Sequence, residues 1–145
     1  MTRMDPAGLR RARAAALQML YQWEVGRIAP DEAVATYWPA HDPDDEVDED
    51  VRAFANGLVR GAIERLAEID ARLSARAHNW RLERMAVLDR AVLRLAVYEL
   101  LSAPGTPAKV VINEALELTR TYSGEEAVAF VNGVLDAVRK DLRRE

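Results

Sequence analysis

The chain contains no cysteine, and this absence excludes several kinds of chemistry at once. Disulfide bonds, thiol catalysis and zinc sites with cysteine ligands all require that side chain. The two histidines, His41 and His78, are too few and too far apart to predict a metal site. No apolar run approaches the roughly 20 residues that span a bilayer, and the N-terminal segment lacks the apolar core of a signal peptide. We therefore expect a cytoplasmic protein with no metal and no membrane contact.

Acidic residues slightly outnumber basic residues, and the two kinds are unevenly distributed along the chain. The chain has 145 residues, of which half are apolar and 30% charged, which is typical of one folded domain. Segment 42–50 holds seven acids and no base, so leaving it out turns the net charge of −4 into +3. Several bases lie near the two ends: Arg10, Arg11, Arg13, Arg139, Lys140, Arg143 and Arg144. This asymmetry is a mild indication of an anionic partner.

The pattern of apolar residues predicts an all-α protein. Asp5 and Pro6 form a helix start, with Asp as N-cap and Pro at the first helical position. Thr106 and Pro107 repeat this pair, and Ser123 to Glu126 fit a capping box. The expected helices cover about residues 6–26, a short stretch from Asp31 that Pro39 ends, 50–74, 82–102, 107–122 and 123–142.

A faint internal repeat is present in the sequence. FANGLVRGAIERL at 54–66 is similar to FVNGVLDAVRKDL at 130–142, which indicates two similar three-helix halves, about 1–76 and 77–145. Chance similarity between amphipathic helices is the alternative. Gly57 and Gly133 lie inside expected helices, where glycine costs roughly 1 kcal/mol relative to alanine. We expect close approach of a neighbouring helix to compensate for this cost.

The first expected helix carries the most informative polar pattern. At 100° per residue, Arg10 and Tyr21 lie within about 20° of each other and roughly 16 Å apart along the axis. Arg11 and Gln18 lie on the adjoining stripe, as does Gln22. Guanidinium groups that bind phosphates, amides that meet base edges and a ring that stacks on a base together suit single-stranded RNA. A solvated helix face with a partly buried tyrosine is the plainer interpretation.

Two later residues are further candidates for contact with another molecule. Asp89 is surrounded on its helix by apolar residues, so its carboxylate requires a cation, supplied either by this chain or by a partner. Phe130 lies at the edge of an apolar arc, one turn after Glu126, and is either a core residue or an exposed stacking ring.

The sequence contains little that would support an enzymatic function. There is no glycine-rich phosphate loop, no GxSxG motif and no convincing pairing of serine with histidine. The acidic segment 42–50 lacks the glycine and the residue order of an EF-hand. We therefore expect neither catalysis nor a bound cofactor.

Four segments of the sequence form a recognisable set: RRARAAALQMLYQWE at 10–24, LDRAVLRLAVYELL at 88–101, TPAKVVINEALELTRTY at 106–122 and AFVNGVLDAV at 129–138. Taken together, they resemble the NusB family of bacterial transcription antitermination factors. The resemblance covers nearly the whole chain, while residues 27–52 match poorly. It implies a NusB-like fold of two perpendicular three-helix subdomains that form a single RNA-binding domain over residues 1–145.

The resemblance also implies a non-enzymatic function and specific partners. Family members pair with NusE, a small-subunit ribosomal protein, and bind the single-stranded boxA element of nascent RNA. With other Nus factors and RNA polymerase they suppress termination, notably in ribosomal RNA operons. The family's RNA-binding positions match Arg10, Arg11, Arg13, Tyr21, Glu126 and Phe130, and Gln18 lies beside them. A family acid that faces NusE matches Asp89, whereas Leu9 stands where some members extend the arginine run.

Two other functions remain open from the sequence. The same fold occurs as the N-terminal RNA-binding domain of RNA cytosine methyltransferases, of which this chain would be a fragment. A helical protein-interaction module without an RNA role is the other alternative. The length of the complete gene distinguishes a methyltransferase fragment from an antitermination factor. A salt-dependent RNA titration distinguishes a protein-interaction module from either RNA-binding protein.

Overall fold

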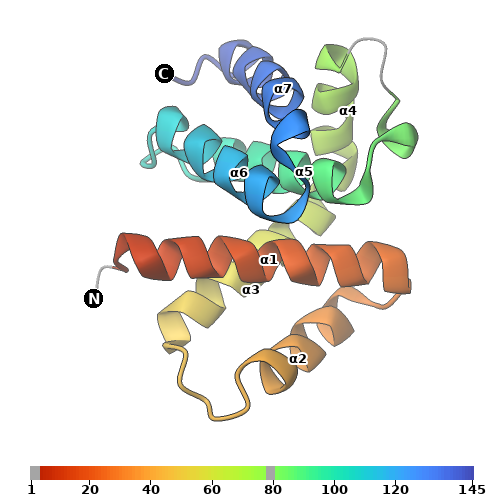
Figure 1. Ribbon diagram of the computed structural model, residues 1–145. Coiled ribbons are helices and arrows are strands. Elements are labelled where there is room, and N and C mark those ends of the chain that lie inside the picture. The colour runs from red at the N-terminus through yellow and green to blue at the C-terminus, as the bar shows by residue number, and fades with distance from the viewer. Residues whose placement is uncertain (1–3, 78–80) are drawn as a thin grey trace. The chain divides into compact units, whose positions relative to one another are not determined.

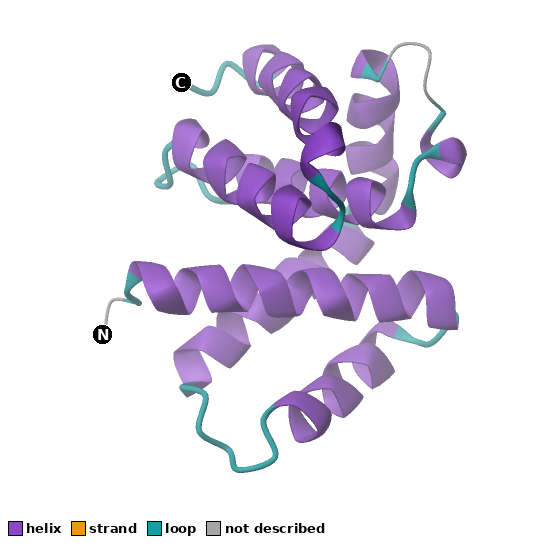
Figure 2. Ribbon diagram, in the orientation of Figure 1, coloured by secondary structure: helices purple, strands orange, loops and turns teal. Residues whose placement is uncertain are grey.

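The structure, a computed structural model, describes residues 4–77 and 81–145 and is helical throughout its regular elements (Figures 1 and 2). The all-α prediction is therefore confirmed. The helices divide into two compact units, Met1–Ile63 and Glu64–Glu145. The division thus falls before the position near residue 76 that the internal repeat indicates. His78, one of the two histidines, lies outside the described residues.

The first unit contains α1 (Pro6–Gly26), α2 (Pro30–His41) and nearly all of α3 (Glu49–Glu64). Helix α1 begins as the sequence predicts, because the Asp5 carboxylate accepts a hydrogen bond of 2.7 Å from the backbone N–H of Gly8. Helix α2 is tied to α3 by the indole N–H of Trp38, which donates to the amide oxygen of Asn56 at 2.9 Å. Small and medium apolar side chains fill the interior of this unit: Ala12, Ala16, Leu20, Ala33, Ala55 and Val59.

Among its described residues, the second unit contains four α-helices and two single 3₁₀ turns. They are α4 (Leu66–Arg76), η1 (Leu82–Arg84), α5 (Val87–Ser102), α6 (Ala108–Tyr122), η2 (Glu125–Ala127) and α7 (Val128–Asp141). Helix α5 is buried on most of its surface and packs against α4, α6 and α7. Arg94 of α5 is buried and forms two 2.9 Å hydrogen bonds with the Asp70 carboxylate of α4. Helix α5 is therefore central to its own unit.

The long helix predicted over residues 50–74 is in fact two helices. The break falls at Arg65, whose backbone angles of φ −104° and ψ 23° depart from α-helical values. The sequence around it contains no proline, and helix-forming residues continue on both sides. The break is a tertiary effect, because it lets α4 pack against α5 and α7 in the second unit.

Four predicted helix ends are wrong, and the first is the start of α5, which lies at Val87 and not at residue 82. Helix α2 continues through Pro39 to His41, whose ring stacks on Tyr37 with ring centroids 4.0 Å apart. Helix α6 has Pro107 as its N-cap with no side-chain cap, so Thr106 does not cap it. The predicted capping box is also absent, since the Ser123 hydroxyl donates to Asp89 and a 3₁₀ turn precedes α7.

The two glycines inside helices do not mark close helix contacts. A Cβ atom added at Gly57 or Gly133 would meet no described atom within 4 Å. The expected packing compensation is therefore wrong at both positions. Near the C-terminus, Arg144 donates to the carbonyl oxygens of Leu100, Ala103 and Thr106.

Candidate nucleic-acid interface

The outer face of α1 holds five of the polar side chains that the sequence singles out. Arg10, Arg11 and Gln22 are exposed, while Gln18 and Tyr21 are half-buried. The stripe joining Arg10 to Tyr21 is interrupted, because Leu17 lies on it and is fully buried. The continuous face is therefore centred on Arg11 and Gln18, and Arg10 and Tyr21 form one edge of it.

Arg13 differs from the two arginines before it. Its side chain is 6% exposed, and its guanidinium carbon lies 5.9 Å from the centroid of the Phe54 ring on α3. A cation at this distance from an aromatic face is attracted by the ring, and more strongly when water is excluded. The structure therefore places Arg13 between helices of the first unit, and the open part of the arginine cluster is Arg10 and Arg11.

The second unit brings together the other three predicted residues, although they are far apart in the sequence. Asp89, Glu126 and Phe130 line one pocket of about 330 Å³. The remaining lining comes from the segment before α5 and from η2: Arg84, Met85, Ala86 and Ala127. This volume lies at the lower end of the range of about 300–1,000 Å³ for ligand pockets.

The two carboxylates of this pocket have different surroundings. Asp89 is half-buried and accepts a hydrogen bond from the Ser123 hydroxyl, which joins α5 to the turn before α7. The sequence left open whether Asp89 pairs with a cation of this chain, and the structure gives it this hydroxyl instead. Gly124 has φ +143°, and a Cβ there would lie 2.7 Å from a carboxylate oxygen of Glu126. Glycine at this position thus leaves room for the Glu126 carboxylate to fold back over the turn.

The opposite wall of the pocket is held by a buried arginine. Arg90 is 8% exposed and donates to the carbonyl oxygens of Leu82 at 2.6 Å and Met85 at 3.2 Å. These bonds fix the backbone that carries Arg84, which is exposed and lines the pocket. Sequence reasoning missed Arg84, because a single arginine in a short polar segment forms no recognisable pattern.

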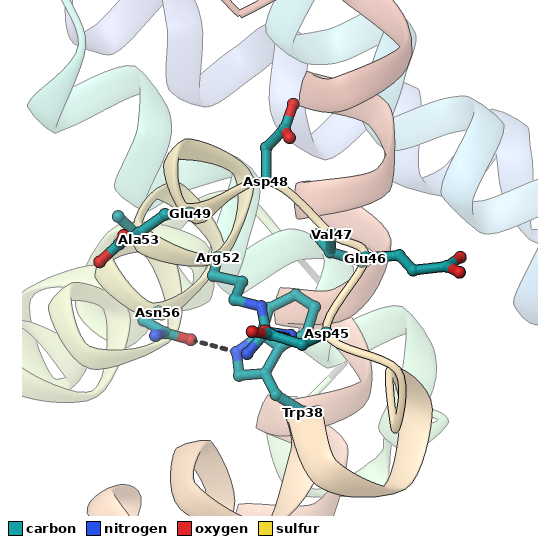
Figure 3. Close-up of a pocket in the computed structure, with 9 residues that line it drawn as sticks. All are labelled: Trp38, Asp45, Glu46, Val47, Asp48, Glu49, Arg52, Ala53 and Asn56. Atoms are coloured by element: carbon teal, nitrogen blue, oxygen red, sulfur yellow. Dashed lines mark hydrogen bonds and ion pairs between the residues drawn. The ribbon is translucent and has the colours of Figure 1, made fainter.

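A larger cavity of about 630 Å³ in the first unit is lined by part of the acidic segment (Figure 3). Its central side chain is Arg52, which forms ion pairs with Asp42 and Asp45 and lies 5.1 Å from the Trp38 ring. Burial alone would raise the pKa of Asp42, but hydrogen bonds from the N–H groups of Val47 and Glu46 and from Arg52 hold it below its usual value. Other acids on the rim repel a polyanion, so we assign no RNA contact to this cavity.

The part of the chain that the structure describes contains no group of three or more residues suited to hold a metal ion. Within the same residues, no helix is long and apolar enough to cross a membrane.

Comparisons with known proteins match this arrangement to one class of transcription factor. A model of the NusB family matches residues 10–140. Transcription antitermination protein NusB of Solibacter usitatus is 48% identical over 94% of this chain and 91% of its own length. The protein of the same name from Anaeromyxobacter dehalogenans is 48% identical over 91% of this chain and 90% of its own. The chain therefore belongs to the NusB family, whose members are antitermination factors rather than enzymes.

Solved structures agree on the fold. NusB of T. maritima is 36% identical and superposes with a TM-score of 0.81 over 91% of this chain and 90% of that one. A crystal structure of antitermination factors NusB and NusE in complex with dsRNA contains a chain 27% identical to this one, with a TM-score of 0.82 over 94% of this chain and 99% of that one. The expected NusB-like fold is confirmed.

Proposed function

We propose that this protein is a transcription antitermination factor that binds boxA-like single-stranded RNA together with the ribosomal protein NusE. It suppresses termination, notably in ribosomal RNA operons, within a larger cytoplasmic complex that includes other Nus factors and RNA polymerase. The observation that carries the proposal is the 48% identity to curated antitermination proteins over more than nine-tenths of both chains. A 27% identical relative that was solved with NusE and dsRNA supports the two partners.

The face of α1 supplies the groups that hold the RNA backbone. Arg10 and Arg11 are exposed and bind phosphates, which makes binding strongly dependent on salt. Tyr21 at the edge of the face stacks on an unpaired base, and Gln18 offers its amide to a base edge. Arg13 supports this helix from its buried position beside Phe54.

The pocket of the second unit supplies contacts of another kind. Glu126 and Phe130 meet the RNA, Phe130 through its ring. Asp89 meets a basic residue of NusE, for which its half-exposed carboxylate is suited. The Ser123 hydroxyl occupies one oxygen of that carboxylate, so the second oxygen is the one that receives the partner's cation.

A binding titration tests the proposal. The probe is a fluorescent boxA-like RNA, with a scrambled RNA and a double-stranded form as controls, each measured with and without purified NusE. We expect the single-stranded boxA-like RNA to bind more tightly than the controls and more tightly still when NusE is present. Equal affinity for all three RNAs, with no effect of NusE, would overturn the proposal.

The same titration distinguishes the alternatives left open by the sequence. A helical interaction module would bind NusE or another protein without binding RNA. The RNA-binding domain of a methyltransferase would bind RNA without any response to NusE.

A further inference from the structure

The pocket between Arg84 and Phe130 presents an electrostatic problem if RNA binds there. Two of its lining side chains, Asp89 and Glu126, are carboxylates that repel phosphates. The lining contains a single cation, Arg84, within the described residues. The arrangement that suits these charges places a phosphate at the cation and a hydrogen-bond donor of a base at a carboxylate.

Arg84 is available for that contact. Its side chain is exposed, and within residues 4–77 and 81–145 it forms no ion pair and no side-chain hydrogen bond. Two other arginines of this unit, Arg90 and Arg120, are engaged elsewhere. Arg90 donates to backbone carbonyls beneath it, and Arg120 is paired with Glu117 and Glu125.

The pocket is also shaped in advance of binding. Arg90 fixes the backbone on the Arg84 side, the Ser123–Asp89 hydrogen bond joins its two walls, and Gly124 makes room for the Glu126 carboxylate. Met85 is 7% exposed and contributes an apolar part of the lining. A prearranged site loses less entropy when a ligand binds.

From these contacts we infer that the pocket receives one unpaired nucleobase bearing an exocyclic amino group, with the adjoining phosphate held by Arg84. The base stacks on Phe130, and its amino group donates to the Glu126 carboxylate. The inference rests on the proposed RNA binding and adds to it a phosphate-binding residue and a preference among bases.

The chemistry of the bases explains the preference. Cytosine, adenine and guanine carry an amino group, which donates hydrogen bonds, whereas uracil carries a carbonyl oxygen in the place of cytosine's amino group. A carboxylate accepts hydrogen bonds and repels a carbonyl oxygen. Cytosine and uracil are nearly equal in size and differ only along the pairing edge, where cytosine presents the amino group beside an acceptor nitrogen and uracil presents a carbonyl oxygen beside an N–H.

The first experiment measures the role of Arg84. The affinity for a single-stranded 12-nucleotide oligocytidine is measured over a range of salt concentrations for the wild type and for Arg84→Ala. The control is Arg81→Ala, because Arg81 is exposed in the same segment but does not line the pocket. We expect Arg84→Ala to weaken binding about tenfold and to reduce the salt slope by about 0.7, the value for one phosphate of a single strand. A slope unchanged from that of Arg81→Ala would overturn the assignment of Arg84.

The second experiment measures the base preference. Affinities for 12-nucleotide oligocytidine and oligouridine are compared in the wild type, in Glu126→Gln and in the control Glu125→Gln, which alters a neighbouring acid outside the pocket. We expect the wild type and the control to prefer oligocytidine by roughly tenfold, the scale of one charge-assisted hydrogen bond. Glu126→Gln should reduce this ratio to near one, because an amide can both donate and accept. An unchanged ratio in Glu126→Gln would overturn the inference.

Failure of this inference and failure of the proposed RNA binding can be told apart with an Arg10→Ala/Arg11→Ala variant measured in the same assay. If that variant loses affinity while the Arg84 and Glu126 variants do not, RNA binding stands and the pocket has no part in it. If the wild type binds none of the RNAs, including the boxA-like probe, the proposed function and this inference fail together.

Discussion

The face of α1 and the pocket of the second unit differ in almost every physical respect. The α1 face carries two exposed arginines, Arg10 and Arg11. The pocket is a hollow of about 330 Å³ in which two carboxylates, one arginine and one aromatic ring converge. An open cationic face attracts any RNA strand, whereas a mixed-charge hollow accepts only a group of matching shape and donor pattern.

The difference indicates how affinity and selectivity are divided between the two units. Phosphate contacts supply affinity that depends on salt and carries no sequence information, and base contacts supply the selectivity. On this account, changes on α1 alter the salt slope, and changes in the pocket alter the choice of base or of protein partner. The predictions below test that division, beginning with the largest effect.

Replacing Arg10 and Arg11 together by alanine should weaken RNA binding by roughly 100-fold at low salt, because two charge-assisted contacts of about 1.5 kcal/mol each are lost. The salt slope should fall by about 1.4, or about 0.7 for each phosphate. Fluorescence anisotropy at several salt concentrations measures both quantities. An unchanged slope would show that these arginines are solvated surface residues.

Asp89→Lys should impair the protein partner rather than the fold. The reversed charge faces a basic residue of NusE, at a cost of about 2 kcal/mol or more in binding. Calorimetry with purified NusE measures this loss, and a thermal melt of the variant alone is the control. Normal NusE binding by the variant would place the interface elsewhere, and an unfolded variant would show that the Ser123–Asp89 hydrogen bond is needed by the fold.

Tyr21→Ala should reduce RNA affinity by about 1–3 kcal/mol, the value of stacking one base on an aromatic ring. Because Tyr21 is half-buried at the edge of the α1 face, the variant should melt close to the wild-type temperature. Tyr21→Phe serves as the matched control and should retain the affinity. A large loss of stability with RNA binding preserved would identify Tyr21 as a core residue.

Arg13→Ala should have the smallest effect on RNA and a clear effect on stability. Its guanidinium lies over Phe54 and is almost fully buried, so no phosphate contact is lost and the salt slope should stay within about 0.2 of the wild-type value. The lost contact with the ring is worth about 0.5–2 kcal/mol of folding free energy. A thermal melt and a salt titration of the same variant check both expectations, and a slope reduced by about 0.7 would restore Arg13 to the RNA-binding set.

Local features of the fold could be predicted from the sequence where a single residue determines them. Asp5 determines the start of α1 through one hydrogen bond to Gly8, and the apolar pattern correctly predicts an all-α protein. The break at Arg65 could not be predicted, because it serves the packing of α4 and leaves no mark in local composition. Ser123 was misassigned for a similar reason, since its hydroxyl bonds with a residue 34 positions away.

For the candidate site too, the sequence identifies single residues but not how they are arranged in space. The residues on α1 could be chosen from spacing alone, but their burial could not, and Leu17 interrupts the predicted stripe. Asp89, Glu126 and Phe130 could each be singled out in the sequence, yet only the structure gathers them in one pocket and adds Arg84 to them. Relations between distant segments are set by tertiary packing, which helical periodicity does not encode.

The most direct test of the proposed function is transcriptional read-through in a purified system. RNA polymerase, NusE and the other Nus factors transcribe a template with a boxA element upstream of a terminator, and the product beyond the terminator is measured with and without this protein. The account predicts that the protein raises read-through on this template, and that it has no effect when boxA is scrambled or when Arg10 and Arg11 are replaced by alanine. Read-through that is unchanged by the protein, or raised equally on both templates, would contradict it.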